Sequence, residues 1–369
     1  MSRREILFTT GSMGRGGAER VLSILASELS RRGWKVHIAM LLNGEIGYDL
    51  PDDVDVVDIS RKERNQWLDT PRMILQTRRI IRKLKPCAVV SFMLTINIVT
   101  WLATRGLQVR FIPSERNDPS KGRGGVKRFL SCKAYAASYR TVLQTERARS
   151  CFSRKIQDRS VIIPNPIQVD QLRSEHPGHK IISVGRLEPQ KNRKLLIEAF
   201  SDIADSFPEY SLHIYGEGSQ ERELKTLIES LGLTDRIEMH GNVLDVHRQM
   251  ADGEIFVLSS DYEGLSNALL EAVMMGFPCI TTDCAGAREA VEDGVNGLIV
   301  PVGDRAAMAK AMAALIQDTG KREAFSRRSV EHAGKFRIGS IVNQWEHLLE
   351  EEDHAENSQS TAEKRNRRK

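Results

Sequence analysis

The stretch Glu254-Ile-Phe-Val-Leu-Ser-Ser-Asp-Tyr-Glu-Gly-Leu-Ser-Asn-Ala-Leu-Leu-Glu-Ala-Val-Met-Met-Gly276 indicates the fold of this chain. Its apolar beginning, Glu254 to Ser259, predicts a strand, and the remainder has the spacing of a helix. Glu263 falls in the turn between them, and Glu271 falls inside the helix. Open α/β sheets bind ligands where strands give way to helices, so the stretch predicts a binding crevice.

The two glutamates of this stretch lie on either side of a predicted helix start. Backbone N–H groups near Ser266, Asn267 and Ala268 have no partner within such a helix and are available to an anion. Two carboxylates beside an anion site could grip two parts of one ligand, which suggests a nucleotide sugar. The simpler alternative is an ordinary helix cap with one solvated glutamate. Residues elsewhere in the chain are needed to distinguish a ligand site from such a cap.

Length and composition indicate two domains of a soluble globular protein. The 369 residues exceed one ordinary core, and 40% are hydrophobic and 28% charged. The charge is uneven: residues 1–165 hold 30 Lys/Arg and 15 Asp/Glu, a net charge of +15, whereas residues 166–369 have a net charge of −10. A basic half could attract phosphates, nucleic acid or an anionic membrane, or could simply be a solvated face.

The cysteines and histidines predict neither disulfides nor a metal site. None of the five cysteines forms a C-x-x-C pair, which fits a reducing compartment, and the nine histidines show no H-E-x-x-H or comparable ligand spacing. Asp53-Val-Asp55 spells a D-x-D motif, but its place at the entry to a strand favours a solvated edge. We therefore expect no metal cofactor.

The N-terminus and the longest uncharged stretch predict neither a signal peptide nor a membrane span. Arg3, Arg4 and Glu5 are followed by only a short strand-like run. The 19 residues from Pro86 to Thr104 carry no charge, but their polar residues favour a strand followed by a buried helix over a spanning helix.

Strands and helices alternate along nearly the whole chain, which predicts an α/β protein with doubly wound parallel sheets. The alternation is interrupted by Pro164-Asn-Pro-Ile167 and a polar stretch through Gly178, then restarts at Ile181. We therefore expect two similar domains. Residues 338–350 predict an amphipathic helix, and residues 351–369 a disordered charged tail.

Glycines cluster where the first predicted strand, Ile6 to Thr10, turns into a helix. Gly14, Gly16 and Gly17 allow the backbone to approach a phosphate or sugar closely. Their spacing does not supply G-x-G-x-x-G, and no G-K-[ST] occurs, so a hydride-transfer dehydrogenase and a P-loop enzyme are both disfavoured.

Two cations follow the first strand of the second half. Arg186 and Lys191 lie in Val184-Gly-Arg-Leu-Glu-Pro-Gln-Lys-Asn192. Arginine could clamp a diphosphate by bidentate hydrogen bonds and lysine as a point charge. An exposed basic turn at a helix start is the alternative.

Together these residues resemble the retaining glycosyltransferases of family 4, the group 1 glycosyltransferases. That family has the GT-B fold, in which two Rossmann-like domains face each other across a cleft and act without a metal. The resemblance covers about residues 4 to 350 and rests on five motifs in order: Gly16-Gly-Ala-Glu-Arg20, Ile163-Pro-Asn-Pro-Ile167, Gly185-Arg-Leu-x-x-x-Lys-Asn192, Gly241-Asn-Val243 and Glu263-x7-Glu271.

The resemblance implies a domain for each substrate. Residues 1–168 would bind the acceptor and residues 178–335 the nucleotide-sugar donor, while residues 336–350 would pack back on the first domain. Arg186, Lys191 and Glu263 would be the catalytic residues, with both cations on the donor diphosphate and Glu263 on the transferred sugar. Glu271 would hold the ribose hydroxyls. The other donor-binding residues would be Gly16, Gly17, Asn242, Val243, Gly264, Leu265, Ser266, Asn267 and Ala268, with Asn242 and Val243 near the nucleobase.

One departure concerns the place where sugar and acceptor meet. Many family members have a histidine after the fifth strand, whereas this chain has Glu115, Arg116 and Asn117 there. The pattern resembles a subgroup that builds bacterial surface glycans and lipid-linked oligosaccharides. It implies transfer of a hexose or N-acetylhexosamine, with UDP as the expected nucleotide, to a polyprenyl-diphosphate-linked or other saccharide acceptor.

Basic clusters at residues 78–85 and 121–133 predict peripheral attachment to the anionic inner face of the cytoplasmic membrane. No recognition motif accompanies this charge, so nucleic acid is not an expected partner. Two alternatives keep the fold. One is a nucleotide-sugar epimerase, and the other is a non-catalytic subunit that binds the nucleotide sugar without turnover.

Overall fold

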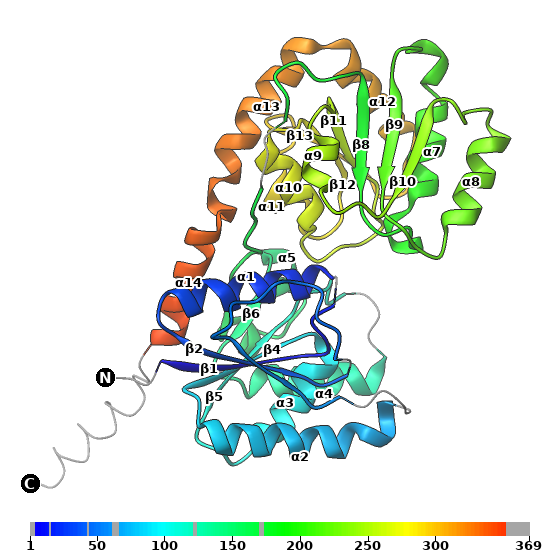
Figure 1. The fold of residues 1–369 in the computed structure, drawn as a ribbon. Helices are drawn as coiled ribbons and strands as arrows, with labels where there is room; N and C mark the ends of the chain where they lie inside the picture. The colour runs from blue at the N-terminus through cyan, green and yellow to red at the C-terminus, as the bar shows by residue number, and fades with distance from the viewer. Residues whose placement is uncertain are drawn as a thin grey trace, which may run out of the picture.

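The computed structural model describes residues 4–14, 16–42, 44–60, 66–120, 124–169 and 173–351, without the side chains of residues 66–68. It contains two parallel sheets, each flanked by helices, which form two domains one above the other in Figure 1. The predicted tail beyond Glu351 and the start of the 121–133 cluster lie outside the described residues.

The first sheet has seven strands in the order β3-β2-β1-β4-β5-β6-β7. The strands are β1 (Glu5–Thr10), β2 (Lys35–Met40), β3 (Asp55–Asp58), β4 (Ala88–Phe92), β5 (Arg110–Ser114), β6 (Thr141–Leu143) and β7 (Ser160–Ile162). The helices are α1 (Gly17–Arg31), α2 (Gln66–Leu84), α3 (Leu94–Thr104), α4 (Gly125–Ala136), α5 (Glu146–Ser150) and α6 (Arg154–Gln157).

The second sheet has six strands in the order β10-β9-β8-β11-β12-β13. The strands are β8 (Lys180–Val184), β9 (Ser211–Tyr215), β10 (Ile237–Gly241), β11 (Ile255–Leu258), β12 (Cys279–Thr282) and β13 (Gly297–Val300). The helices are α7 (Arg193–Ser201), α8 (Glu221–Ser230), α9 (Val246–Met250), α10 (Asn267–Met275), α11 (Ala287–Ala290), α12 (Arg305–Gln317) and α13 (Thr319–Ala333).

Both sheets run outward in two directions from their first strand, so both are doubly wound, as the alternating pattern predicts. In the second sheet the strand order reverses between β8 and β11, which pair directly through Ile181 with Ile255. Ligands of such sheets bind beyond the carboxyl ends of the strands at this switch point. A ligand-binding site is therefore expected at the loops that follow Val184 and Leu258.

The last helix returns to the first domain. α13 runs from the second domain toward the first, and α14 (Ile338–Glu350) lies beside α1 (Figure 1). The apolar face of α14 is buried in the first domain's core, where Trp345 stacks on Phe92 with ring centroids 6.3 Å apart. One chain thus crosses between the domains twice.

The uncharged stretch from Pro86 to Thr104 forms β4 and the largely buried helix α3, as predicted. Among the described residues, no helix combines the length and the apolar composition that crossing a bilayer requires.

Candidate active site

The predicted catalytic residues come together at the switch point of the second sheet. Arg186 and Lys191 lie in the loop after β8, and Glu263 lies in the loop after β11. Lys191 Nζ is 2.5 Å from Glu263 Oε1, and the two side chains are 14% and 9% exposed. Ser260 Oγ donates to the same oxygen at 2.6 Å. The carboxylate is thus held by an ammonium and a hydroxyl, whereas Arg186 is exposed to solvent.

Sequence reasoning missed a third cation at this place. Arg193, the first residue of α7, is fully buried, and its guanidinium donates to Ser183 Oγ. In the described part of the chain, its Nε and Nη2 have no hydrogen-bond partner. Burial lowers the pKa of Arg193 to about 10, and the negative charge of Glu263 opposes that shift. The sequence signal that could have revealed it is a cation at the start of a helix whose other buried residues are apolar.

Gly185 makes room for these cations. Its φ is +141°, and a Cβ there would lie 3.0 Å from Arg193 Nη2 and 3.4 Å from Lys191 Cε. A side chain at this position would be both strained and crowded. The glycine before Arg186 therefore allows the loop to pass closely over two positive charges.

The start of α10 lies beside this loop. Ser266 caps the helix, with Oγ accepting from Leu269 N at 3.4 Å, and Gly276 ends it with a φ of 87°. The N–H groups of Asn267 and Ala268 are in the first turn, where a helix offers no acceptor of its own. Gly264 and Leu265 lead into this turn. The positive end of α10 is thus available to an anion.

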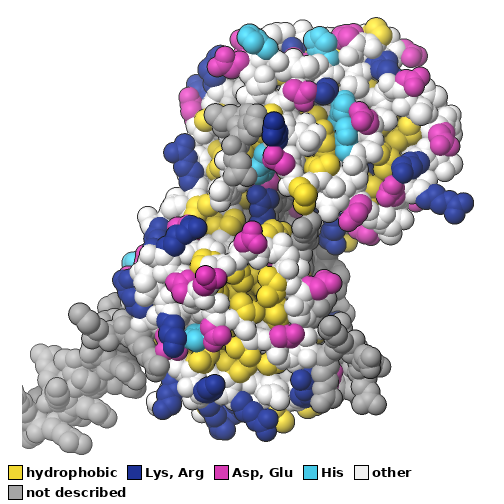
Figure 2. Space-filling view, in the orientation of Figure 1, with side chains coloured by type: hydrophobic (Ala, Val, Ile, Leu, Met, Phe, Trp, Pro, Cys, Tyr) yellow, Lys and Arg dark blue, Asp and Glu magenta, His cyan; other side chains and the backbone are white. Residues whose placement is uncertain are grey.

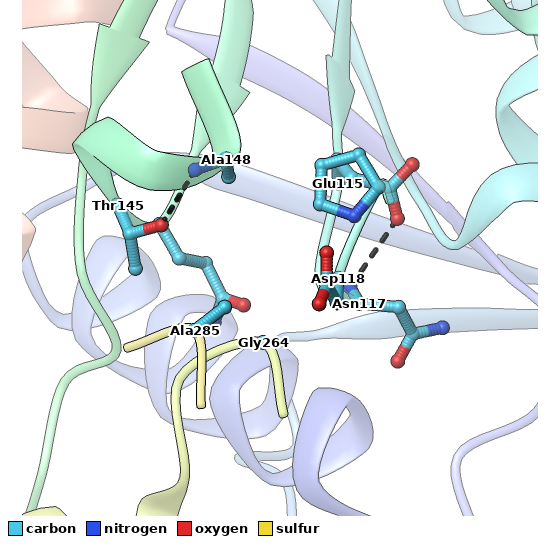
Figure 3. Close-up of a pocket in the computed structure, with 9 residues that line it drawn as sticks. Glu115, Asn117, Asp118, Thr145, Ala148, Gly264 and Ala285 are labelled. Atoms are coloured by element: carbon cyan, nitrogen blue, oxygen red, sulfur yellow. Dashed lines mark hydrogen bonds between the residues drawn. The ribbon is translucent and has the colours of Figure 1, made fainter. Parts of the chain in front are cut away.

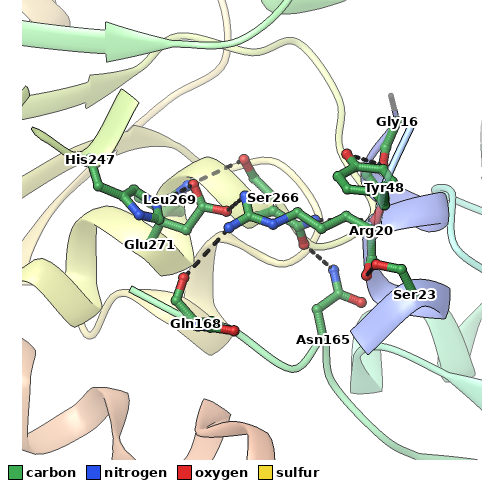
Figure 4. A network of polar contacts seen from close by, with 12 residues as sticks. Gly16, Arg20, Ser23, Tyr48, Asn165, Gln168, His247, Ser266, Leu269 and Glu271 are labelled. Carbon is green, nitrogen blue, oxygen red and sulfur yellow. Dashed lines mark hydrogen bonds and ion pairs between the residues drawn. The ribbon is translucent and has the colours of Figure 1, made fainter. Parts of the chain in front are cut away.

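Glu271 forms an ion pair across the domain boundary. Its side chain, one turn inside α10, is 6% exposed. Arg20 Nη1, from α1 of the first domain, lies 2.5 Å from Glu271 Oε1, and His247 Nε2 lies 3.3 Å from Oε2 (Figure 4). His247 is on α9, which follows the loop carrying Asn242 and Val243. This loop and Glu271 are therefore linked through α9.

The glycine-rich turn of the first domain also contacts α10. Asn267 Nδ2 donates to the carbonyl of Gly17 at 3.2 Å, and the Tyr48 hydroxyl donates to the carbonyl of Gly16 at 3.1 Å. A Cβ at Gly17 would lie 3.4 Å from Asn267 Nδ2. Gly17 thus lies against the same helix start as the other predicted donor residues, whereas Gly16 is bonded by Tyr48 within the first domain.

Asn165, in the proline-flanked break, connects the domains. It donates to Asn267 Oδ1 at 2.5 Å and to the carbonyl of Leu265 at 3.2 Å. Its own oxygen accepts from Arg116 at 2.8 Å and from Gln144 at 2.6 Å. The sequence predicts a linker here, but a buried amide that bonds to both domains was not foreseen.

A narrow crevice lies where the two domains meet (Figure 3). Glu115, Asn117 and Thr145 of the first domain line it, together with Gly264 and Ala285 of the second. The Tyr135 hydroxyl donates to Glu115 Oε2 at 2.7 Å. Two of the three predicted acceptor-side residues therefore line this crevice between the domains.

The third, Arg116, does not point into the crevice. Its guanidinium lies over the rings of Phe92 and Trp345, 4.9 and 5.8 Å from their centroids, and burial lowers its pKa to about 9. Its backbone lies against the second domain, since a Cβ on Gly264 would lie 2.4 Å from the Arg116 carbonyl oxygen. The sequence placed Arg116 with Glu115 and Asn117 where sugar and acceptor meet, but its side chain does not line the crevice with them.

Comparison with known families agrees with this architecture. Residues 165–332 match the family described as glycosyl transferases group 1, and residues 16–161 match the glycosyl transferase 4-like domain. The chain belongs to the group 1 glycosyltransferases. The two matches together include most strands of both sheets, and the predicted family and GT-B fold are confirmed.

Two curated relatives of this glycosyltransferase have informative names. The N-acetylgalactosamine-N,N'-diacetylbacillosaminyl-diphospho-undecaprenol 4-alpha-N-acetylgalactosaminyltransferase of Campylobacter jejuni is 28% identical over 354 residues, covering 88% of this chain and 93% of the relative. The exopolysaccharide phosphotransferase SCO2592 of Streptomyces coelicolor is 32% identical over 243 residues, covering 64% of this chain. The chain spans about a quarter of that second relative, 26% of its length.

Among solved structures, Anabaena Alr3699/HepE in complex with UDP superposes with a TM-score of 0.80 at 18% identity, covering 94% of this chain and 99% of that one. At this identity the likeness shows the shared fold.

Proposed function

We propose that this glycosyltransferase is a retaining enzyme that moves a hexose or N-acetylhexosamine from a UDP-sugar to a lipid-linked saccharide. The observation that carries the proposal is the Lys191–Glu263 pair above buried Arg193, beside the start of α10. Breaking the anomeric bond builds negative charge on the departing diphosphate and positive charge on the sugar. Fixed cations and helix-start N–H groups stabilise the first, and a carboxylate lies close to the second.

Each donor group has a proposed partner. Arg186 and Lys191 bind the diphosphate, and Glu263 accepts a hydrogen bond from the transferred sugar. Glu271 accepts from the ribose hydroxyls, while Asn242 and Val243 lie beside the base. The departing phosphate accepts the acceptor's proton, so transfer on the same face of the sugar needs no general base and no metal ion.

The acceptor is proposed to enter from the first domain, past Glu115 and Asn117. The Campylobacter relative is named for an undecaprenol-diphosphate acceptor, which supports a lipid-linked saccharide here. Lys and Arg side chains along the lower edge of the first domain support a place on the anionic inner face of the cytoplasmic membrane (Figure 2). On α4, Val126 and Phe129 are 75% and 58% exposed beside further basic residues.

The test is product formation from a panel of UDP-sugars and a polyprenyl-diphosphate-linked saccharide, read by mass spectrometry and by NMR of the new anomeric centre. We expect one new sugar with the donor's α configuration. Lys191→Ala and Glu263→Gln should each lower kcat by about 100-fold or more, the size of loss when one group that stabilises transition-state charge is removed. Lys194→Ala is the matched control, because its ammonium lies on the exposed side of α7, 4.0 Å from Glu198.

Three results would contradict the proposal. Inversion at the anomeric centre would exclude a retaining mechanism. A changed sugar nucleotide without any acceptor would indicate an epimerase. Donor binding that stays intact while no acceptor is ever glycosylated would indicate a binding subunit. Membrane attachment is tested separately by flotation with anionic liposomes at low salt, and absence of binding there would exclude it.

A further inference from the structure

Two histidines and a glutamate, none of them assigned above to the donor, cluster on the second sheet. His213 is on β9, and Glu238 and His240 are on the edge strand β10. Their ligand atoms all lie within 4.8 Å of one another. They border a hollow of about 320 Å³ together with Tyr215 and Asp252. Figure 2 shows histidine side chains beside acidic and basic ones on the visible face of this domain.

The strand register builds the cluster. Glu238 is directly opposite His213, so both side chains share one face of the sheet. The pairing then shifts between Met239 and Gly241, which makes His240 an extra residue in β10. Such bulges are found at sheet edges and redirect a side chain. His240 is thereby stacked on Tyr215, with ring centroids 4.3 Å apart, and still reaches His213.

The ring nitrogens and the carboxylate lie close enough together to reach one metal ion. His213 Nε2 lies 2.9 Å from Ser211 Oγ, which can accept its proton and leave the Nδ1 lone pair free. That Nδ1 lies 2.9 Å from His240 Nε2, and the other nitrogen of His240 lies 3.4 Å from Glu238 Oε1. Glu238 Oε2 is 3.6 Å from His213 Nδ1. Two nitrogen atoms and a carboxylate oxygen therefore converge.

We propose that His213 Nδ1, His240 Nε2 and a Glu238 oxygen bind Zn²⁺, with water as the fourth ligand. Nitrogens bound tetrahedrally to zinc lie about 3.3 Å apart, so the two rings need to separate by about 0.4 Å. Two imidazoles and a carboxylate suit zinc and disfavour Mg²⁺, which prefers oxygen ligands. Lys180 lines the hollow, but its Nζ is paired with Asp252 at 2.6 Å, which offsets its charge.

A metal here would join β10 to β9. The loop that carries Asn242 and Val243 begins at the end of β10, so zinc would hold the start of that loop in place. The zinc site does not depend on the proposed transfer reaction. It would lie at the sheet edge, and its binding is measured without any sugar nucleotide.

The experiment uses the full chain without a histidine tag, freed of metal and titrated with ZnCl2 in a calorimeter. We expect one equivalent to bind, no response to MgCl2, and higher amide protection of residues 237–243 with zinc in hydrogen exchange. His240→Ala should abolish this binding, and Ser211→Ala should weaken it by about 10- to 100-fold through loss of the ring's partner. His176→Ala is the control, because it removes an exposed histidine from the segment that precedes β8.

His240 is the chosen ligand because its side chain is 21% exposed, whereas replacing His213 could unfold the domain. Equal zinc affinity in His240→Ala and the parent chain would overturn the proposal. The absence of zinc binding by the parent chain would also overturn it, and the contact between the His213 and His240 rings would then be a hydrogen bond alone. Titration with Co²⁺ in place of zinc tests a third outcome. Sulfur-to-metal charge-transfer bands in the absorption spectrum would show that the metal binds cysteine thiols, and they would refute the site.

Discussion

Arg20 in the first domain and Glu271 in the second form an ion pair across the cleft, with Nη1 and Oε1 2.5 Å apart. Glu271 is the carboxylate proposed to accept hydrogen bonds from the donor's ribose. Its other oxygen is 3.3 Å from His247, so both oxygens already have partners. A donor that uses Glu271 must therefore displace Arg20 or share the carboxylate with it.

We expect Arg20→Ala to tighten UDP binding by about threefold to tenfold. The guanidinium competes with the ribose for Glu271, and partly exposed ion pairs of this kind contribute about 1 kcal/mol. Calorimetric titration with UDP measures the change. Arg31→Ala is the control, because this exposed arginine lies on the same helix and pairs with Glu28 instead. Weaker UDP binding in Arg20→Ala would show that Arg20 binds the nucleotide rather than competing with it.

Arg193→Met should lower kcat by about tenfold while leaving the thermal midpoint unchanged or higher. The guanidinium supplies positive charge beneath the Lys191–Glu263 pair, but two of its nitrogens have no hydrogen-bond partner in the described structure. Replacing such a buried charge with an apolar side chain is often neutral or stabilising. Steady-state kinetics and calorimetry measure the two effects.

Lys194→Met serves as the control for Arg193→Met, since it removes the neighbouring cation from the exposed side of α7. If Arg193→Met lost stability and activity together, the role of Arg193 would be structural. If kcat stayed at the parent value, the charge would play no part in the reaction.

Much of the fold could be predicted from the sequence because buried parallel strands are apolar runs bounded by turn residues. The strand predicted at residues 254–259 is β11, and the strand and buried helix predicted between Pro86 and Thr104 are β4 and α3. The predicted helix at residues 338–350 is α14. The position of Lys191 and Glu263 at neighbouring strand ends followed from the motif order.

What could not be predicted depends on pairing between distant residues. His213 and His240 come together through strand register and a bulge, so their sequence spacing of 27 residues gave no metal-ligand pattern, and none was predicted. Arg116 follows a strand like its neighbours, yet the return of α14 supplies the aromatic face that draws its side chain away. Arg20 meets Glu271 only because the two domains close on each other.

Cys284 should make stability fall as pH rises above about 9. Burial raises the pKa of its thiol from 9.0 to about 12, and the negative charge of Glu263 adds to the shift. The folded chain then keeps a proton that the unfolded chain releases, so folding is penalised between about pH 9 and pH 12. Cys284→Ala should flatten this part of the curve of unfolding free energy against pH.

The same burial should keep Cys284 unreactive in the folded chain. The thiolate is the nucleophile toward iodoacetamide, and a raised pKa leaves little of it. We expect mass spectrometry to find Cys284 alkylated in urea but not in buffer at neutral pH. Rapid alkylation of the folded chain would show that this thiol is accessible and ionised.

Gly264→Ala should hold the two domains apart. A Cβ at Gly264 would lie 2.4 Å from the Arg116 carbonyl oxygen and 2.7 Å from Gln144 Oε1, both in the first domain. Overpacking of this kind costs about 1 to 3 kcal/mol, and here opening the cleft relieves it. Opening would also separate Arg20 from Glu271. We expect a larger radius of gyration by small-angle X-ray scattering and, because the substrates are then misplaced, a transfer rate lower by about tenfold or more. Gly339→Ala is the control, because a Cβ there meets no atom within 4 Å. An unchanged radius of gyration with a normal rate would mean that the closed contact at Gly264 is not required for transfer.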